Sequence, residues 1–290
     1  MTASGFHPSR GRLVDIGGRR LRAVPAGPAA ASPLILLEAG SFGCAADWAV
    51  VQARLAEKGL RSLAYDRAGL GYSDPGPSPR DARAIATDLE ALLAEMGETG
   101  PLVVVGHSMA GLFLRVFAPR NRRRVAGVVL VDAVTPEMMD ARGPAMAFHA
   151  YRHAMGLVGR WADSGFMRPV SLVIGDLIGL EGEARKEKRR VYGSATHARW
   201  SADEVQNWLR SVRQARETAS GFEPELPIAV VTAGARGKAL HAAPARASQL
   251  GYLEHAPGAN HASLLGKAYA DPIVRGIEHV LTAAAARKAA

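Results

Sequence analysis

The sequence predicts an α/β protein built on a doubly wound, mostly parallel sheet, with a helical segment inserted between two of its strands. Short runs of Val, Leu and Ile, typical of buried parallel strands, alternate with longer stretches of helical periodicity. Between residues 135 and 225 helical patterns dominate, and the strand pattern returns at Pro227. With 290 residues, 48% of them hydrophobic, the chain is long enough to build one such domain with an insertion.

Each strand is expected where a short apolar run is bounded by turn-forming residues. Residues 11–24 predict an antiparallel hairpin around Gly17-Gly18, and Val170–Ile174 fits either a strand or a helix. The buried strands expected after the hairpin are Leu34–Leu37, Leu60–Tyr65, Val103–Val105, Val125–Val131, Pro227–Thr232 and Gly251–His255. The expected helices are Ala46–Lys58, Ser78–Gly97, Met109–Asn121, Ala145–Met155, Ala202–Ala219 and Asp271–Leu281.

The junction between the strand Val103–Val105 and the following helix carries a candidate nucleophile, Ser108. Small residues flank it, and they let the strand and the helix pass close to each other. A serine at such a sharp turn is held in a strained conformation that projects its hydroxyl away from the sheet. The backbone N–H of Met109, at the start of the helix, would then stabilise negative charge that develops on a substrate. A Gly/Ser turn without chemical meaning is the alternative.

Residues 106–111, Gly-His-Ser-Met-Ala-Gly, resemble the nucleophile elbow of the α/β-hydrolase superfamily. Ala110 stands where the commonest form has glycine, and it is small enough for the same close packing. The resemblance extends over nearly the whole chain. We therefore expect a core domain of residues 1–134 and 226–290 and a helical cap of residues 135–225, which would close over the site and set specificity.

The loop after the strand Leu34–Leu37 is the expected second half of the oxyanion hole. Gly40 matches a glycine that the superfamily has in this loop, so the resemblance implies that the backbone N–H of Ser41 is the second donor. Phe42 is the alternative if the register differs by one residue. A Gly-rich turn without a role remains the third interpretation. The loop from Asp66 to Asp74 lacks the third glycine of a phosphate-binding loop and is interpreted as structural.

A serine hydroxyl needs a base to become nucleophilic, and His261 is the candidate. It lies in a turn-rich loop between the last expected strand and the last helix, where the superfamily places its catalytic histidine. His255 is a rival, and a solvent-exposed loop histidine is the alternative. His107, beside the serine, is expected to pack beneath the turn.

The acid that orients the histidine is not where the superfamily commonly has it. That place follows the strand Pro227–Thr232, yet residues 226–253 contain no Asp or Glu. Some members carry the acid after the preceding strand, where Asp132 stands here. The order Ser108, Asp132, His261 agrees with that of the fold. Glu254, Glu38 or no acid at all are the alternatives, as is a role for Asp132 in capping alone.

Composition excludes several other kinds of site. The single cysteine, Cys44, excludes an internal disulfide and a Cys-based zinc site. His149 and His153 are four residues apart but lack a third ligand, so we expect no metal and no cofactor. The net charge is +9, but the basic residues are scattered. The tightest basic clusters, Arg122–Arg124 and Arg185–Arg190, are interpreted as solvated surface and not as a nucleic-acid interface.

No stretch approaches the 18 apolar residues of a transmembrane helix, and the N-terminal residues lack the apolar core of a signal peptide. A cytoplasmic enzyme without a membrane span is the simplest expectation, with a signal removed before this numbering left open. The oligomeric state is left open as well.

The predicted function is hydrolysis of a carboxylic ester of a small or medium, partly apolar molecule through an acyl-enzyme. A lactonase, an amidase or a C–C bond hydrolase would use the same residues. A dehalogenase or an epoxide hydrolase would be expected to carry aspartate in place of Ser108. A non-catalytic ligand-binding protein of the same fold is the alternative from another class. Pocket residues within the cap could come from its large apolar side chains, although most should form the cap's own core: Met138, Met139, Met146, Phe148, Met155, Trp161, Phe166 and Met167.

Overall fold

The computed structural model describes residues 9–289 except 141, 175–176, 219–221 and 235–238. It contains an eight-stranded mixed sheet in the order β1-β2-β4-β3-β5-β6-β7-β8. The strands β1 and β2 form the predicted hairpin and pair antiparallel, as do β2 and β4, and the other pairs are parallel. The strands are β1 (Arg12–Asp15), β2 (Arg20–Ala26), β3 (Leu34–Glu38), β4 (Ser62–Tyr65), β5 (Leu102–His107), β6 (Val125–Val131), β7 (Ile228–Ala233) and β8 (Gly251–Ala256).

The strand order locates the functional edge of the sheet. From β3 the chain moves to β4 on one side, and it then crosses back to β5 on the other side of β3. Ligands of open α/β sheets bind at such a switch point, beyond the carboxyl ends of the strands. The loops that follow β3 and β5 therefore meet at this edge, and the loop after β6 lies beside them because β6 pairs with β5.

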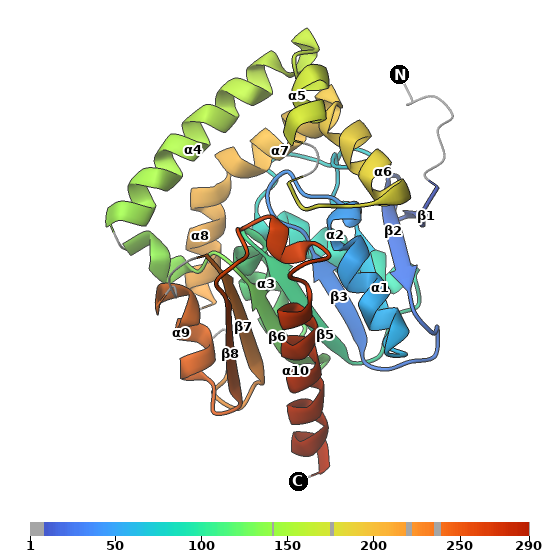
Figure 1. Cartoon of the computed structure of the whole chain (residues 1–290), viewed down its shortest axis with the longest axis vertical. Helices are drawn as coiled ribbons and strands as arrows, with labels where there is room; N and C mark the ends of the chain where they lie inside the picture. The colour runs from blue at the N-terminus through green and yellow to red at the C-terminus, as the bar shows by residue number, and fades with distance from the viewer. Residues whose placement is uncertain (1–8, 141, 175–176, 219–221, 235–238, 290) are drawn as a thin grey trace.

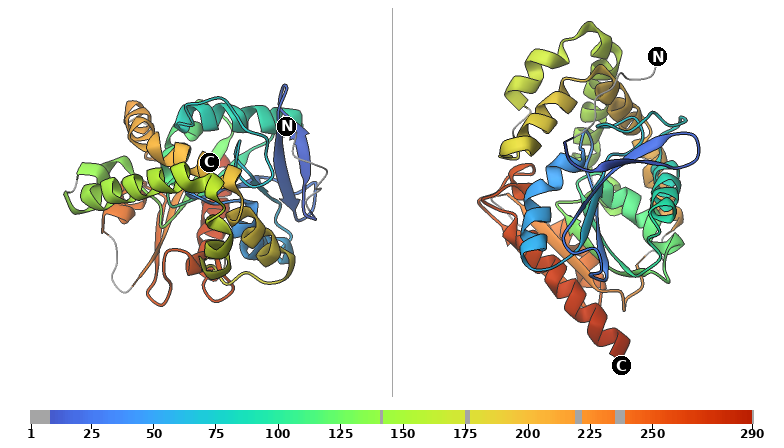
Figure 2. Two further views of the ribbon diagram at one scale, coloured as in Figure 1. Left: turned by 90° about the horizontal axis from the view of Figure 1, so that it is seen from above. Right: turned by 90° about the vertical axis from the view of Figure 1, so that its right-hand side faces the viewer.

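Helices cover both faces of the sheet, as the doubly wound pattern predicts (Figures 1 and 2). One face carries α1 (Ala49–Glu57) and α10 (Asp271–Ala289), which share an apolar core with β3, β5 and β6. The other face carries α2 (Ala82–Glu95), α3 (Ala110–Arg120) and α8 (Trp208–Glu217), which pack against one another. The helix α9 (Ala239–Ala247) contacts β7 and β8.

The segment between β6 and β7 is helical, as predicted. Figure 1 shows helices of this segment above the sheet, while α8 descends beside the sheet. The helices above the sheet are α4 (Arg142–Trp161), α5 (Met167–Ile174), α6 (Gly182–Tyr192) and α7 (Ala195–Gln206). Two short 3-10 helices, Pro136–Asp140 and Ala162–Ser164, flank α4. The division into a core and a cap of residues 135–225 stays a prediction.

The segment Val170–Ile174, which its sequence left open between a strand and a helix, belongs to the helix α5. Several predicted helices have other bounds in the structure. The helix predicted from Ser78 begins at Ala82, because the Asp81 side chain accepts a hydrogen bond from the N–H of Ala84 and caps the helix there. The helix predicted over 202–219 divides at Asn207, the C-cap residue of α7, and its last residue lies outside the described part of the chain.

Buried ion pairs fasten the inserted helices to the sheet. Arg22 on β2 contacts both carboxylate oxygens of Glu187 on α6, at 2.6 and 2.9 Å. Arg67, in the loop after β4, contacts both carboxylate oxygens of Glu204 on α7, at 2.8 and 2.7 Å. Such bidentate pairs fix orientation as well as distance. The positions of α6 and α7 over the strand ends are therefore specified by charged side chains.

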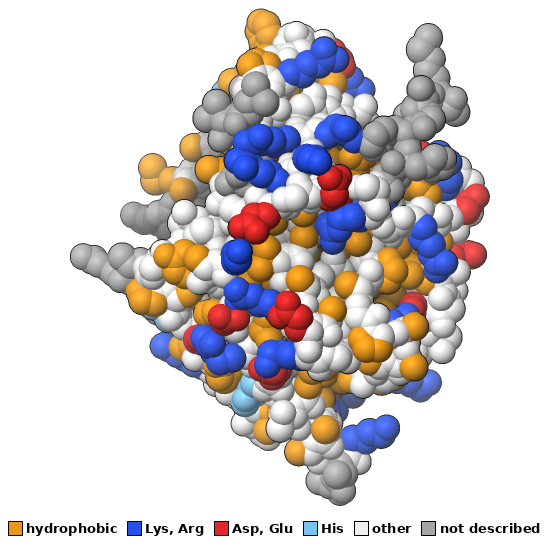
Figure 3. All heavy atoms as spheres, turned by 45° about the vertical axis from the view of Figure 1, so that its right-hand side comes forward, with side chains coloured by type: hydrophobic (Ala, Val, Ile, Leu, Met, Phe, Trp, Pro, Cys, Tyr) orange, Lys and Arg blue, Asp and Glu red, His pale blue; other side chains and the backbone are white. Residues whose placement is uncertain are grey.

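The molecular surface shows the spread of charge that the sequence indicates. On the face in Figure 3, Lys and Arg side chains extend from the top of the molecule to its lower end, with Asp and Glu side chains among them. Among the described residues, no helix combines the length and the apolar character needed to cross a membrane.

Candidate active site

Ser108 lies at the turn between β5 and α3 with a φ of 57°. Only small neighbours allow this turn, because a Cβ on Gly106 would lie 2.7 Å from the Leu114 side chain. A Cβ on Gly111 would lie 2.3 Å from the carbonyl oxygen of Val134. The N–H of Ser108 donates to the carbonyl of Val131 on β6, which ties the strained residue to the sheet. A positive φ at a non-glycine residue costs energy, and the surrounding packing maintains it.

The loop after β3 approaches Ser108 closely. A Cβ on Gly40 would lie 2.8 Å from the Cβ of Ser108, so only glycine fits there. Ser41 lines the same cavity as Ser108, and its hydroxyl shares a hydrogen bond of 2.9 Å with that of Tyr151 on α4. Phe42 has a φ of 55° and a buried side chain. Within the described residues, no hydrogen bond is found from the backbone N–H of Ser41 or of Met109.

Asp132 and His261 are in direct contact. Asp132 directly follows β6, has a φ of 43° and is 1% exposed. Its Oδ2 lies 2.7 Å from Nδ1 of His261, which comes from the loop between β8 and α10. Its Oδ1 accepts a hydrogen bond from the N–H of Ala233 at the end of β7 and lies 4.0 Å from Nε2 of His241. A buried carboxylate held in this way fixes the orientation of an imidazole.

Ser108 and His261 line one cavity, and the structure shows no hydrogen bond between these two described residues. The side chain of His261 is 51% exposed. In structures without a substrate such contacts are often long and tighten only when a substrate binds. The Ser108 hydroxyl and the His261 imidazole thus border one cavity, and the buried Asp132 carboxylate contacts the imidazole without itself lining the cavity.

The rival residues from the sequence have other partners. Glu38 is buried and contacts Arg67, and Glu254 pairs with Arg275. His255 shares a hydrogen bond of 2.8 Å with Thr232. None of the three rivals is among the residues that line the cavity with Ser108.

The side chain of His107 is buried and lies among the residues that line the cavity with Ser108. Its Nε2 lies 2.9 Å from the carbonyl oxygen of His261, so it supports the loop that carries that residue. Burial, together with the nearby His261, lowers the pKa of His107 to about 3. His107 is therefore neutral near pH 7 and adds no charge beside Ser108.

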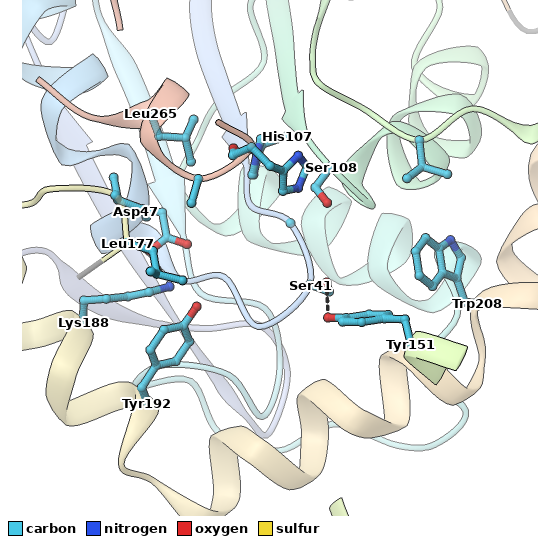
Figure 4. Close-up of a pocket in the computed structure, with 15 residues that line it drawn as sticks. Ser41, Asp47, His107, Ser108, Tyr151, Leu177, Lys188, Tyr192, Trp208 and Leu265 are labelled. Atoms are coloured by element: carbon cyan, nitrogen blue, oxygen red, sulfur yellow. Dashed lines mark hydrogen bonds and ion pairs between the residues drawn. The ribbon is translucent and has the colours of Figure 1, made fainter. Parts of the chain in front are cut away.

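The cavity has a volume of about 390 Å³, within the range of small-molecule sites. Figure 4 shows the side chains that line it. Four segments of the core contribute to it, together with α4, α6, the loop between α5 and α6, and the start of α8. The lining residues are Gly40, Ser41, Asp47, His107, Ser108, Val134, Tyr151, Leu177, Ile178, Lys188, Tyr192, Trp208, His261, Ala262 and Leu265.

None of the cavity residues from the inserted segment was predicted from the sequence. None of the eight large apolar side chains considered there lines this cavity, and Tyr151, Lys188, Tyr192 and Trp208 do. Lys188 also corrects the interpretation of Arg185–Arg190 as solvated surface, because it is 1% exposed. A lysine at the same helical face as buried Ala184 and Val191 was the available signal.

No group of three or more possible metal-ligating side chains occurs among the residues that the structure describes. Cys44 is buried and unbridged, and burial raises its pKa well above the ordinary value, so its thiol stays protonated. The two candidate metal ligands in α4, His149 and His153, have no third partner of this kind in the described chain.

Comparison with known proteins adds the family. The family model described as alpha/beta hydrolase fold matches residues 33–156, which include β3, the turn at Ser108 and β6. The chain belongs to the α/β-hydrolase fold superfamily. The matched part covers the loops of Gly40 and Ser108 and ends within α4.

Curated relatives of this α/β hydrolase match over parts of their length. "Probable transporter efuK" of Hormonema carpetanum is 38% identical over 135 residues, which are 44% of this chain and 19% of that protein. An AB hydrolase superfamily protein of Gibberella zeae is 35% identical over 105 residues, 35% of this chain and 32% of that protein. The chain thus spans a fifth to a third of the length of these relatives.

Solved structures share the whole fold. Epoxide hydrolase CorEH superposes with a TM-score of 0.70 at 21% identity, over 91% of this chain and 96% of that one. A thermophilic esterase from Thermogutta terrifontis gives a TM-score of 0.65 at 20% identity, over 92% and 94% of the chains. At these identities the likeness shows the fold alone, because one fold hosts many reactions.

Proposed function

We propose that this α/β hydrolase is a serine hydrolase that cleaves a carboxylic ester of a small or medium, partly apolar molecule. The observation that carries the proposal is the strained Ser108 facing the same cavity as His261, whose Nδ1 contacts the buried Asp132. Ser108 would be the nucleophile, His261 the base and Asp132 the acid that orients it. Within this proposal, residues 135–225 form the cap over the cavity.

The reaction would proceed in two halves. The Ser108 hydroxyl attacks the ester carbonyl while Nε2 of His261 takes its proton, since Nδ1 is engaged by Asp132. The backbone N–H groups of Met109 and Ser41 then hold the oxyanion, and each donor of this kind is worth roughly 3–4 kcal/mol of transition-state stabilisation. His261 returns the proton to the leaving alcohol. Water, activated by His261, finally releases the acid and frees Ser108.

The environment of the site supports this chemistry. The close approach of Gly40 to Ser108 brings the backbone after β3 beside the nucleophile, where the second oxyanion donor has to be. His107 remains neutral beside His261, so it adds no positive charge that would repel the imidazolium formed on His261. The side chain at the nucleophile position is a serine hydroxyl, which forms an ester with the acyl group that it attacks.

A fluorophosphonate probe tests the proposal independently of any substrate. We expect covalent labelling of the wild-type chain at Ser108, identified by peptide mass spectrometry, and no labelling of Ser108→Ala. Ser41→Ala, which retains the backbone N–H, is the matched control and should label. Absence of labelling at every pH tested from about 6 to about 9, where a histidine can act as a base, would favour a ligand-binding protein.

A further inference from the structure

The cavity has two chemically different walls, on opposite sides of Ser108 (Figure 4). On one side lies the indole ring of Trp208, beside the ring of Tyr151, whose hydroxyl is engaged by Ser41. On the other side lie Lys188, Asp47 and Tyr192, which bring a charged pair and a phenol to a cavity that is otherwise mostly apolar. The apolar Leu177 and Leu265 lie on the same side. An ester has two parts joined at the carbonyl that Ser108 would attack, so each wall would face one part.

The polar wall is well ordered by its own contacts. Lys188 Nζ lies 2.6 Å from Oδ1 of Asp47 and donates to the carbonyl oxygen of Phe42 at 3.3 Å. It also lies 4.1 Å from the centre of the Tyr192 ring, one helical turn further along α6. Lys188 is 1% exposed and Asp47 is 5% exposed. The hydroxyl of Tyr192 points toward the middle of the cavity in Figure 4.

This wall carries no net charge but is rich in hydrogen-bonding groups. Burial opposes the charge on Lys188, but the Asp47 carboxylate and the other groups around the ammonium together outweigh it, so the pKa of the lysine lies above its ordinary value. A substrate carboxylate would approach the negative Asp47, and a substrate ammonium would approach the positive Lys188. An alkyl group would exclude solvent from these polar groups without offering them any further hydrogen bond, which is costly.

A neutral hydroxyl suits this wall, because it can donate to Asp47 and accept from Lys188 or Tyr192. Building on the proposed function, we propose that the polar wall binds a hydroxyl group of the substrate on one side of the scissile ester. The preferred substrates are then hydroxylated esters whose other part is apolar and packs against Trp208. The wall distinguishes such esters from their alkyl and carboxylate analogues.

Matched esters measure this selectivity. One set pairs 4-hydroxybutyl butyrate with pentyl butyrate, and a second pairs butyl 6-hydroxyhexanoate with butyl heptanoate, so that the hydroxyl replaces a methyl group in either part. Monobutyl adipate supplies the carboxylate analogue. We expect kcat/KM by pH-stat to favour the hydroxylated ester about tenfold or more in one set, and to favour it over the adipate, because a site built for a hydroxyl rejects analogues that lack it.

Tyr192→Phe removes one hydroxyl from the wall and should reduce this preference several-fold. The double variant Lys188→Met, Asp47→Leu removes the ion pair without leaving a buried charge, and it should abolish the preference. Tyr252→Phe is the matched control, since the Tyr252 hydroxyl donates to Glu254 on β8 outside the cavity, and it should retain the wild-type ratio.

The outcomes separate the two proposals. Serine-dependent hydrolysis with equal kcat/KM within both pairs, or a preference that both cavity variants retain, would overturn the hydroxyl subsite and leave the serine hydrolase intact. A greater preference for the adipate would overturn it in favour of an anion subsite. Hydrolysis of no ester, with no labelling of Ser108 by a fluorophosphonate, would overturn both proposals together.

Discussion

Asp132 reaches His261 from the end of β6, with 2.7 Å between Oδ2 and Nδ1. The carboxylate is anchored on the neighbouring strand, because the N–H of Asp132 donates to Val231 and the N–H of Ala233 donates to its Oδ1. In the proposed mechanism, Asp132 would serve as the acid from the end of β6. Residues 226–253, where the resemblance to the superfamily first led us to look for the acid, contain no Asp or Glu.

Asp132→Asn tests the role of this contact. The amide would keep the volume but lose the charge that stabilises an imidazolium, so we expect kcat for a reactive ester to fall by about 10⁴. Glu254→Gln, at the rival acid, should change kcat less than about threefold, which is within the range of an uninvolved residue. If Asp132→Asn retained more than a tenth of the wild-type kcat, another residue would have to orient His261.

Gly40→Ala tests the close approach of the two loops. The added methyl group would lie 2.8 Å from the Cβ of Ser108 and 3.2 Å from Nδ1 of His107, so the loop has to move. We expect kcat to fall by about 10²-fold, as for loss of an oxyanion donor. Gly100→Ala is the control, because its Cβ meets nothing within 4 Å and its φ lies outside the left-handed range. Equal kcat in both variants would remove the loop from the oxyanion hole.

Two buried histidines make stability depend on pH. Burial lowers the pKa of both His107 and His197 from 6.5 to about 3. The unfolded chain therefore binds protons between pH 6.5 and 3 that the folded chain excludes, and the free energy of unfolding falls as the pH falls through this window. Each group contributes up to about 1.4 kcal/mol per pH unit.

Urea unfolding at several pH values between 4.5 and 7 measures this slope. We expect the free energy of unfolding of His197→Gln to depend less steeply on pH, by the amount that corresponds to about one bound proton. His149→Gln, at an exposed histidine, is the matched control and should leave this dependence unchanged. A slope in His197→Gln equal to that of the wild type would show that this histidine titrates alike in both states.

Glu204→Ala tests the attachment of α7 to the sheet. It would leave the buried Arg67 with a single carboxylate partner, Glu38, so we expect a loss of about 3 kcal/mol in the free energy of unfolding. Glu217→Ala, which removes an exposed partner of Arg83, should cost less than about 1 kcal/mol. Equal losses in the two variants would contradict a special role for the buried pair.

The sheet was predictable because its strands are short apolar runs that leave little alternative. The run Val125–Val131 became β6 over the same residues, and the elbow turn follows from small residues on either side of Ser108. Asp132 could be singled out only because the resemblance gave a second place to look for an acid. Local patterns show which residues can react, and the fold decides which of them meet.

The cavity walls could not be predicted in the same way. Lys188 lies in a charged run, and its burial depends on Asp47, which is 141 positions earlier in the chain. Tyr151 reaches Ser41 only because α4 crosses above the loop after β3. Such contacts come from the packing of the inserted helices, for which periodicity gives a buried face but no partner.

Hydrolysis of a p-nitrophenyl ester series from acetate to dodecanoate, by the wild type beside Ser108→Ala, is the most direct test of a serine nucleophile at this site. We expect turnover by the wild type with an optimum among the shorter chains, as a cavity of about 390 Å³ allows, and loss of turnover in a folded Ser108→Ala. Turnover that Ser108→Ala retains, or no wild-type turnover on any ester, would contradict this expectation.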